Sequence, residues 1–102
     1  MAFIKLGSVR AFPNVKPTKE QALKVLEEAS EAVEAFKNLL DASRDADYNP
    51  RWEREDLLDE IADTVTACCN LAASLGVHDL TPYIARCEER NRRRGRYGDQ
   101  DD

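Results

Sequence analysis

The sequence predicts an all-α protein built on a long antiparallel helical hairpin with a shorter third helix. Apolar residues recur with the 3.6-residue period of a helix over residues 18–43, 52–75 and 81–95, and no segment alternates with the two-residue period of a strand. Residues that favour turns separate these segments, and an Asn49-Pro50 pair closes the first break. The pattern therefore indicates helices joined by short connections.

The N-terminal residues 1–17 contain glycine and proline at several positions and are expected to form an irregular arm. Thr18 and Gln21, in the stretch "TKEQ", form a capping box that begins the first helix. We expect residues 18–95 to form one helical domain and residues 96–102 to be a disordered tail.

The second and third helices have boundary signals of their own. The second begins near Trp52, and Gly76 follows its last apolar residue, where a left-handed cap is expected. Thr81 is predicted to cap the third helix, with Pro82 in its first turn. That helix is expected to end near Gly95.

Composition excludes several classes of protein. The chain has 102 residues, a net charge of −5 and a pI near 4.9, so binding to a polyphosphate backbone is not expected. No apolar run approaches the ~20 residues that span a bilayer, and the first residues lack the apolar core of a signal peptide. The cysteines have no metal-binding spacing and are interpreted as buried thiols of a cytoplasmic protein: Cys68, Cys69 and Cys87.

Acidic residues gather on one flank of each long helix. The apolar stripe of the first helix centres on Ala29 and Phe36, whereas Glu28 and Glu31, three residues apart, share a separate flank. The apolar stripe of the second helix centres on Ile61, Val65 and Ala72. Away from it runs a polar stripe made of Asp56, Glu60, Asp63, Ala67 and Asn70. The two apolar stripes are expected to face the core.

These acidic stripes have an energetic cost. Like charges three or four residues apart destabilise a helix by a few tenths of a kcal/mol per pair, and no lysine or arginine is expected within the two stripes. A hard divalent cation such as Mg²⁺ or Mn²⁺ would neutralise them, because it prefers carboxylate oxygens. A solvated acidic surface explains the same periodicity equally well.

The order of the acids resembles a known motif pair. Glu28-x-x-Glu31 followed by Glu60-x-x-Asp63 resembles the metal helices of the all-α nucleoside triphosphate pyrophosphatase superfamily, which includes the MazG proteins, dimeric dUTPases and phosphoribosyl-ATP pyrophosphohydrolases. "VLEEASEAV" is similar to the first of those helices and "DEIADTVTACCNLAASLGV" to the second. "ERNRRRGRY" looks like the basic end of short MazG-like proteins, with arginine at position 90 where lysine is common. The resemblance covers residues 25–97 except the loop at 44–51.

The resemblance implies hydrolysis of a nucleoside triphosphate between its α and β phosphates, giving a monophosphate and pyrophosphate, with a role in clearing the nucleotide pool. It implies Mg²⁺, for which Mn²⁺ can substitute, held by Glu28, Glu31, Glu60 and Asp63. Either Glu27 or Glu31 would accept the proton of the attacking water. Substrate contacts are expected from Asn70, Arg90, Asn91 and Arg94.

Other interpretations stay open at this point. Within the same superfamily the substrate would instead be phosphoribosyl-ATP. A non-catalytic helical module that only dimerises would also carry acidic surface residues. The flat shape of a hairpin with one short helix, and apolar residues outside the main stripes at Leu23, Leu39 and Leu71, predict a homodimer with a four-helix core, or a tetramer of two such dimers.

Overall fold

The computed structural model describes residues 2–98 and contains, over that range, three helices and no strand: α1 (Lys19–Ser43), α2 (Arg51–Ser74) and α3 (Thr81–Arg93). This confirms the predicted all-α class. Contacts divide the chain into two units: Val9–Gly76, which holds α1 and α2, and a second unit formed by residues 2–8 and 77–98 of the described part, which holds α3. The expected domain over 18–95 therefore spans parts of both units. Most of the expected tail, residues 99–102, lies outside the described range.

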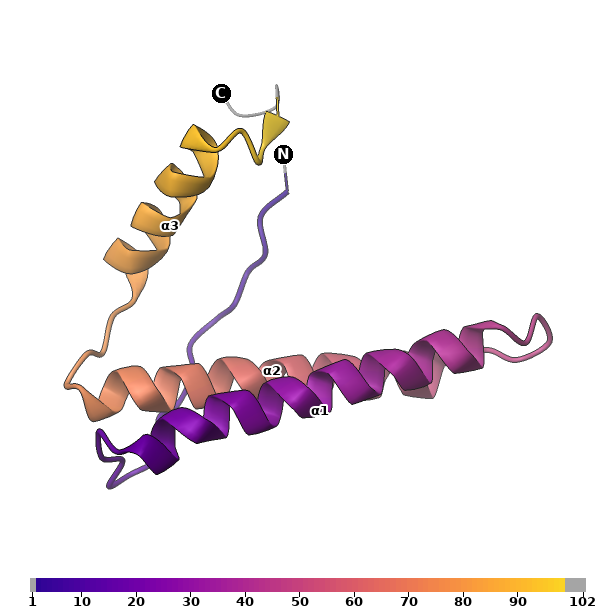
Figure 1. The fold of residues 1–102 in the computed structure, drawn as a ribbon, viewed down its shortest axis with the longest axis horizontal. Coiled ribbons are helices and arrows are strands. Elements are labelled where there is room, and N and C mark those ends of the chain that lie inside the picture. Colours follow the sequence, from indigo (N-terminus) through magenta and orange to yellow (C-terminus); the bar gives the residue numbers. More distant parts are fainter. Residues whose placement is uncertain (1, 99–102) are drawn as a thin grey trace. The chain divides into compact units, whose positions relative to one another are not determined.

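The hairpin is formed by α1 and α2, which pack side by side and are joined at one end by a short connection (Figure 1). The arm before α1 contains neither helix nor strand over residues 2–17. Thr18 caps α1 as predicted, since its hydroxyl accepts a hydrogen bond from the Gln21 N–H at 3.2 Å. In the connection, the Tyr48 hydroxyl donates to the Glu53 carboxylate at 2.9 Å, which raises the pKa of Tyr48 and ties the loop to α2.

The ends of α2 lie within one residue of the prediction. Gly76 follows the helix with a φ of 78°, the left-handed conformation expected at this cap. A second left-handed glycine, Gly95 at 71°, ends α3. There the Arg96 N–H donates to the Asn91 carbonyl at 3.0 Å and the Gly95 N–H to the Arg92 carbonyl at 2.9 Å, which satisfies carbonyls that the helix leaves unpaired.

The predicted cap of α3 is wrong by one residue. Leu80 occupies the cap position, and Thr81 is already helical with Pro82 beside it in the first turn. The Thr81 N–H donates to the Asp79 side chain at 2.9 Å. Hydrogen bonds from the side chain and the backbone of Thr81 lower the pKa of Asp79. The carboxylate of Asp79, rather than the hydroxyl of Thr81, therefore accepts from the start of this helix.

The seam between α1 and α2 is the set of buried or half-buried positions that recur at intervals of three and four residues along each helix. On α1 these are Gln21, Val25, Glu28, Ala32, Ala35, Leu39 and Ala42. On α2 they are Glu53, Leu57, Glu60, Thr64, Ala67, Leu71 and Ser74. This spacing is the one by which paired helices keep contact along their length. Among the described residues only two apolar side chains are buried, Ala35 at 4% exposure and Ala67 at 7%.

The expected core stripes do not form the seam, which corrects the sequence prediction. Phe36 is 47% exposed and Ile61 45% exposed, although both were expected to face the core. The helices instead meet through a mixture of short side chains, leucines and glutamates, in which the alanines Ala35 and Ala67 are the most deeply buried apolar residues. The larger apolar residues form an apolar face that is largely exposed in this chain, namely Leu26, Val33, Phe36 and Leu40 of α1 with Leu58, Ile61 and Val65 of α2.

The apolar face lies on one side of the hairpin. On each helix its residues are displaced from the seam by about 110° in the same rotational sense, given 3.6 residues per turn. Because the helices are antiparallel, that shared displacement brings both rows to the same side. Glu31, Asp63 and Asn70 are displaced in the opposite sense and face the other side.

Two further expectations concern surfaces. Cys68 and Cys87 are exposed and Cys69 is half-buried, so the expected burial of the cysteines is wrong for this chain. The three thiols are free. Within the described part of the chain, no helix combines the length and apolar character needed to cross a membrane.

Thr18→Ala removes the side-chain cap of α1 and is expected to lower the free energy of unfolding by about 1 kcal/mol. Thr18→Ser is the matched control, because it keeps the hydroxyl that accepts from Gln21. Urea unfolding at one fixed protein concentration measures both variants. Equal losses in the two variants would show that the cap is not responsible.

Candidate metal centre

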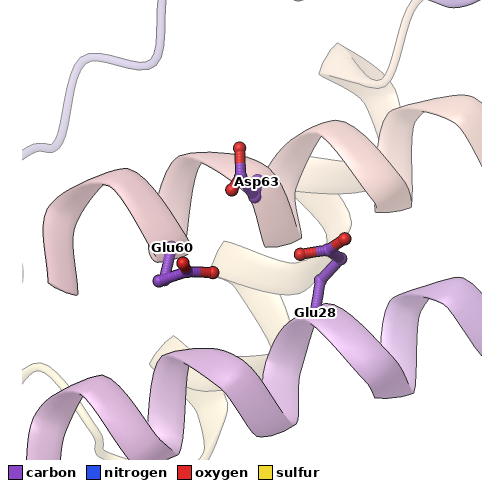
Figure 2. A group of neighbouring side chains, drawn as sticks. All are labelled: Glu28, Glu60 and Asp63. Atoms are coloured by element: carbon purple, nitrogen blue, oxygen red, sulfur yellow. The ribbon is translucent and has the colours of Figure 1, made fainter. Parts of the chain in front are cut away.

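Three carboxylates meet halfway along the hairpin. Glu28 comes from α1, and Glu60 and Asp63 come from α2 (Figure 2). Each offers one oxygen, and these three oxygens all lie within 4.8 Å of one another. We call this group the acidic triad. It contains three of the four acids predicted as metal ligands.

The triad exists because Glu28 and Glu60 occupy positions of the seam. Side chains at such positions point toward the neighbouring helix, and Figure 2 shows Glu28 rising from α1 toward α2. Asp63 follows Glu60 by three residues and so stands one turn along on the same side of α2. Two glutamates thus take places where a helix pair would ordinarily pack apolar side chains.

Burial and mutual repulsion work against ionisation of these groups. The pKa of Glu28 is raised mainly by partial burial. The charge of Glu31 and a hydrogen bond with it raise this pKa further, followed by the charges of Asp63 and Glu27. The pKa of Glu60 is raised mainly by partial burial, and then by the charges of its acidic neighbours Glu31, Asp63, Asp56 and Glu28, in that order. The folded state therefore holds negative charge that lacks compensation.

One carboxylate oxygen of the triad lacks a hydrogen-bond partner. Oε2 of Glu60 is buried and has no hydrogen-bond partner among the described residues. A buried carboxylate oxygen without a partner is costly, because it has lost water and gained nothing in exchange. A cation between the three carboxylates would supply the missing partner and neutralise the repulsion.

The chemistry of the triad fits a hard divalent cation. All three donors are carboxylate oxygens, the ligand type that Mg²⁺ and Mn²⁺ prefer over nitrogen or sulfur. Three protein oxygens also leave positions for water and phosphate oxygens, as is usual for Mg²⁺. The free cysteines and His78 are not members of the triad.

The remaining acids of the prediction lie at the margin of the triad. Glu31 is exposed and is not a member of the group within 4.8 Å, yet its charge is the largest electrostatic influence on both Glu28 and Glu60. Glu27 is paired with Lys24, whose Nζ lies 3.3 Å from its Oε2. The choice between Glu27 and Glu31 as proton acceptor stays a prediction.

A groove of about 410 Å³ leads away from the triad along the hairpin. Its lining comes from the arm, α1 and α2: Phe12, Gln21, Lys24, Glu28, Asp63, Thr66, Ala67 and Asn70. Two triad carboxylates stand at one end, and the arm closes the other. The groove therefore joins a charged end to an end with an aromatic side chain and an amide.

Asn70 ties the arm to the hairpin. The residue is only 3% exposed, and its Oδ1 accepts a hydrogen bond from the Phe12 N–H at 2.9 Å. This bond orients the side-chain amide, because the oxygen must face Phe12 and the NH₂ group must then point elsewhere. Asn70 was predicted to contact substrate, and it does line the groove, but it also has this structural role.

Sequence interpretation predicted three of the eight lining residues as site residues, and two of the five that it missed bear on the chemistry of the groove. Lys24 stands one turn before Glu28 and corrects the expectation that no cation lies beside the acids. Lys24 lies four residues before Glu28, and this spacing alone predicts that the two side chains are neighbours on the helix. Phe12 carried no such signal, because an irregular arm has no periodicity from which its position follows.

The predicted basic residues belong to the other unit. Arg90 and Asn91 lie on α3, and Arg94 caps its C-terminus. Both side-chain groups of Asn91 are used locally, since Nδ2 donates to the Cys87 sulfur at 3.6 Å and Oδ1 accepts from Arg96 at 3.2 Å. Contact between these residues and a substrate stays a prediction.

The raised pKa of Glu60 predicts a specific pH dependence for the metal-free protein. A carboxyl whose folded-state pKa exceeds the reference value of 4.5 favours folding when protonated, and this contribution is lost as pH rises through the folded-state pKa. Glu60→Gln cannot ionise. Its melting temperature relative to wild type should therefore rise as pH increases from the reference pKa through the raised folded-state pKa, and then level off.

Glu55→Gln is the control for this experiment, because Glu55 is an exposed carboxyl on the same helix outside the triad. Thermal melts in EDTA across the pH range give the comparison. A difference between Glu60→Gln and wild type that does not change with pH would contradict the electrostatic account.

Comparison with known proteins gives no match: no protein-family model, curated protein or solved structure matches this chain. The functional proposal therefore depends on the residues of the chain and on the geometry described above.

Proposed function

We propose that this protein is a metal-dependent nucleoside triphosphate pyrophosphohydrolase, which converts an NTP or dNTP and water into the monophosphate and pyrophosphate. The observation that carries the proposal is the acidic triad with its buried, unpartnered Glu60 oxygen. A surface of solvated acids would leave these side chains in water, without a desolvated carboxylate between two helices. The resemblance of the two acidic motifs to those of the all-α pyrophosphatases supports the choice of reaction.

The metal ligands in this proposal are Glu28, Glu60 and Asp63, and Glu31 adjoins them because its side chain is hydrogen-bonded to that of Glu28. When bound, Mg²⁺ neutralises the carboxylates, attracts the phosphates of the substrate and lowers the pKa of a coordinated water. Without it, an acidic pocket would repel a triphosphate.

The chain itself supplies orientation and proton transfer. Glu28 and Glu60 are held by opposite helices, so the packing of the hairpin fixes their separation. An exposed carboxylate beside the triad, Glu31 or Glu27, accepts the proton of the attacking water. Hydrolysis then breaks the bond between the α and β phosphates and places the water oxygen on one of the two products.

The groove is where the nucleoside would lie. Phe12 offers an aromatic face for a base at the end away from the triad, and the NH₂ group of Asn70 offers a donor for a base or sugar oxygen. From Asp63 to Asn70 along α2 the axial distance is about 10 Å. This length suits a nucleoside joined to phosphates at the triad.

Removing one ligand should abolish most of the reaction. Glu60→Gln and Asp63→Asn are expected to reduce hydrolysis by at least about 100-fold, since loss of a metal ligand exceeds the effect of its outer-shell partners. Asp59→Asn is the matched control, because Asp59 adjoins Glu60 in sequence but is exposed outside the triad. Mg²⁺ should raise the melting temperature of wild type and of Asp59→Asn more than that of the two ligand variants.

The assay is pyrophosphate release from a panel of NTPs, dNTPs and phosphoribosyl-ATP. Preference for the last compound would identify the alternative substrate within the same superfamily. Full hydrolysis in excess EDTA, or no hydrolysis of any compound together with no effect of Mg²⁺ on the melting temperature, would reject the proposal and leave a non-catalytic helical module.

We propose in addition that two copies associate through the apolar face to form a four-helix core. Leu26 is 66% exposed and Val33 56% exposed, and the hairpin has few buried apolar side chains of its own. Exposed apolar rows of this length on both helices of a pair mark an association surface. The face lies on the side of the hairpin opposite the acids, so a second hairpin layer covers it without covering the groove.

A charge on the apolar face should dissociate the pair. Val33→Glu and Phe36→Glu are expected to give monomers, because each would bury a carboxylate between two apolar layers. Asn38→Glu is the control with the same new side chain on the opposite side of α1. Sedimentation at micromolar concentration measures the mass. A wild-type protein that is a folded monomer contradicts the proposal, and a mass of four chains indicates two such dimers.

A further inference from the structure

Lys24 lines the groove between its two ends, and the metal proposal gives no role to the positive charge of this side chain. Among the eight lining residues, Lys24 is the single cation, and it stands between the triad and the end formed by Phe12 and Asn70. Along the axis of α1 it lies about 6 Å from the level of Glu28 and about 4.5 Å from that of Gln21. A ligand that reached from the carboxylates to the arm would pass this side chain.

The contact that Lys24 makes now is a weak one. Its Nζ lies 3.3 Å and 3.4 Å from the two carboxylate oxygens of Glu27, and both side chains are more than half exposed. Exposed ion pairs of this kind contribute about 0–1 kcal/mol, because water competes for both partners. The α-phosphate of a nucleoside triphosphate carries one negative charge, as the Glu27 carboxylate does, and it accepts the same kind of charge-assisted hydrogen bond from an ammonium group. Lys24 can therefore exchange Glu27 for a phosphate oxygen at small cost.

We propose that the Nζ of Lys24 binds the α-phosphate of the substrate, a role that rests on the pyrophosphohydrolase function. The α-phosphate is the group that connects the nucleoside, which occupies the groove, with the rest of the triphosphate at the triad. It is thus the phosphate that lies midway. Glu27 holds the ammonium at the edge of the groove until the substrate arrives.

This assignment predicts that Lys24 contributes to the binding of one reaction product and not of the other. The monophosphate keeps the α-phosphate and so keeps its contact with Lys24, whereas pyrophosphate contains only the β and γ phosphates and loses it. Removal of the ammonium should therefore weaken binding of monophosphates and leave binding of pyrophosphate nearly unchanged. A lysine that acted only through the overall charge of the site would affect both products.

The experiment is calorimetric titration of the four common deoxynucleoside monophosphates and of pyrophosphate, each with Mg²⁺, into wild type and Lys24→Met. We expect Lys24→Met to bind the monophosphate preferred by wild type at least about 10-fold more weakly, the effect of one hydrogen bond to a charged group. Pyrophosphate should bind both proteins within about 3-fold. Lys24→Arg should restore most of the affinity for the monophosphate.

Lys37→Met is the matched control, because Lys37 pairs with Glu34 three residues away on the same helix and does not line the groove. Monophosphate binding by Lys24→Met equal to that of wild type, equal weakening of both products, or no monophosphate binding by wild type overturns the assignment to Lys24. Wild type that binds monophosphates through Lys24 but hydrolyses no triphosphate refutes the proposed function instead. The two proposals thus fail separately.

Discussion

Two carboxylates between packed helices are the constraint from which the rest of this structure follows. Glu28 and Glu60 occupy seam positions, so the contact that holds α1 against α2 also brings like charges together and withdraws them from water. Neutral residues at those positions would pack better. A cation bound between the two carboxylates would remove this cost, because its attraction to both side chains would replace their mutual repulsion. In the function that we propose, fold stability and metal binding would therefore be coupled at this point.

The same constraint explains the composition of the seam. Carboxylates that shared an ion, as we propose, would require backbones at a short and fixed separation, and alanines permit close approach of two helices. Ala35 and Ala67 are the buried apolar residues of the described chain. Larger side chains such as Phe36 are displaced to the flank, where they cannot stabilise a single hairpin. Much of the apolar area of the hairpin is therefore exposed in this chain.

Helix boundaries were predictable because local chemistry determines them. Thr18 and Gly76 act where the sequence indicated, through a hydroxyl acceptor and a left-handed backbone. The partner of each apolar stripe was not predictable. Periodicity shows which residues share a face, but it does not distinguish a helix of the same chain from one of another molecule. Exposed Phe36 and buried Asn70 both reflect that ambiguity.

Of the candidate site, the acids were predictable and their neighbours only partly. Carboxylates at a helical spacing identify a shared flank, so Glu60 and Asp63 were found from sequence. Lys24 lies four residues before Glu28 and so shares its flank of the helix, but a pattern defined by like charges does not include it. Phe12 depends on one long-range hydrogen bond to Asn70, fifty-eight residues away, which no local pattern encodes.

That hydrogen bond changes what counts as the minimal functional fragment. A chain shortened to begin at Lys19, the first residue of α1, would retain both long helices and every acidic ligand. It would nevertheless lose the aromatic wall of the groove and leave the Asn70 oxygen, buried at 3% exposure, to find a water molecule instead. If the proposed function holds, such a fragment would still bind the metal ion, whereas its selectivity among nucleotide bases would belong to a differently lined groove.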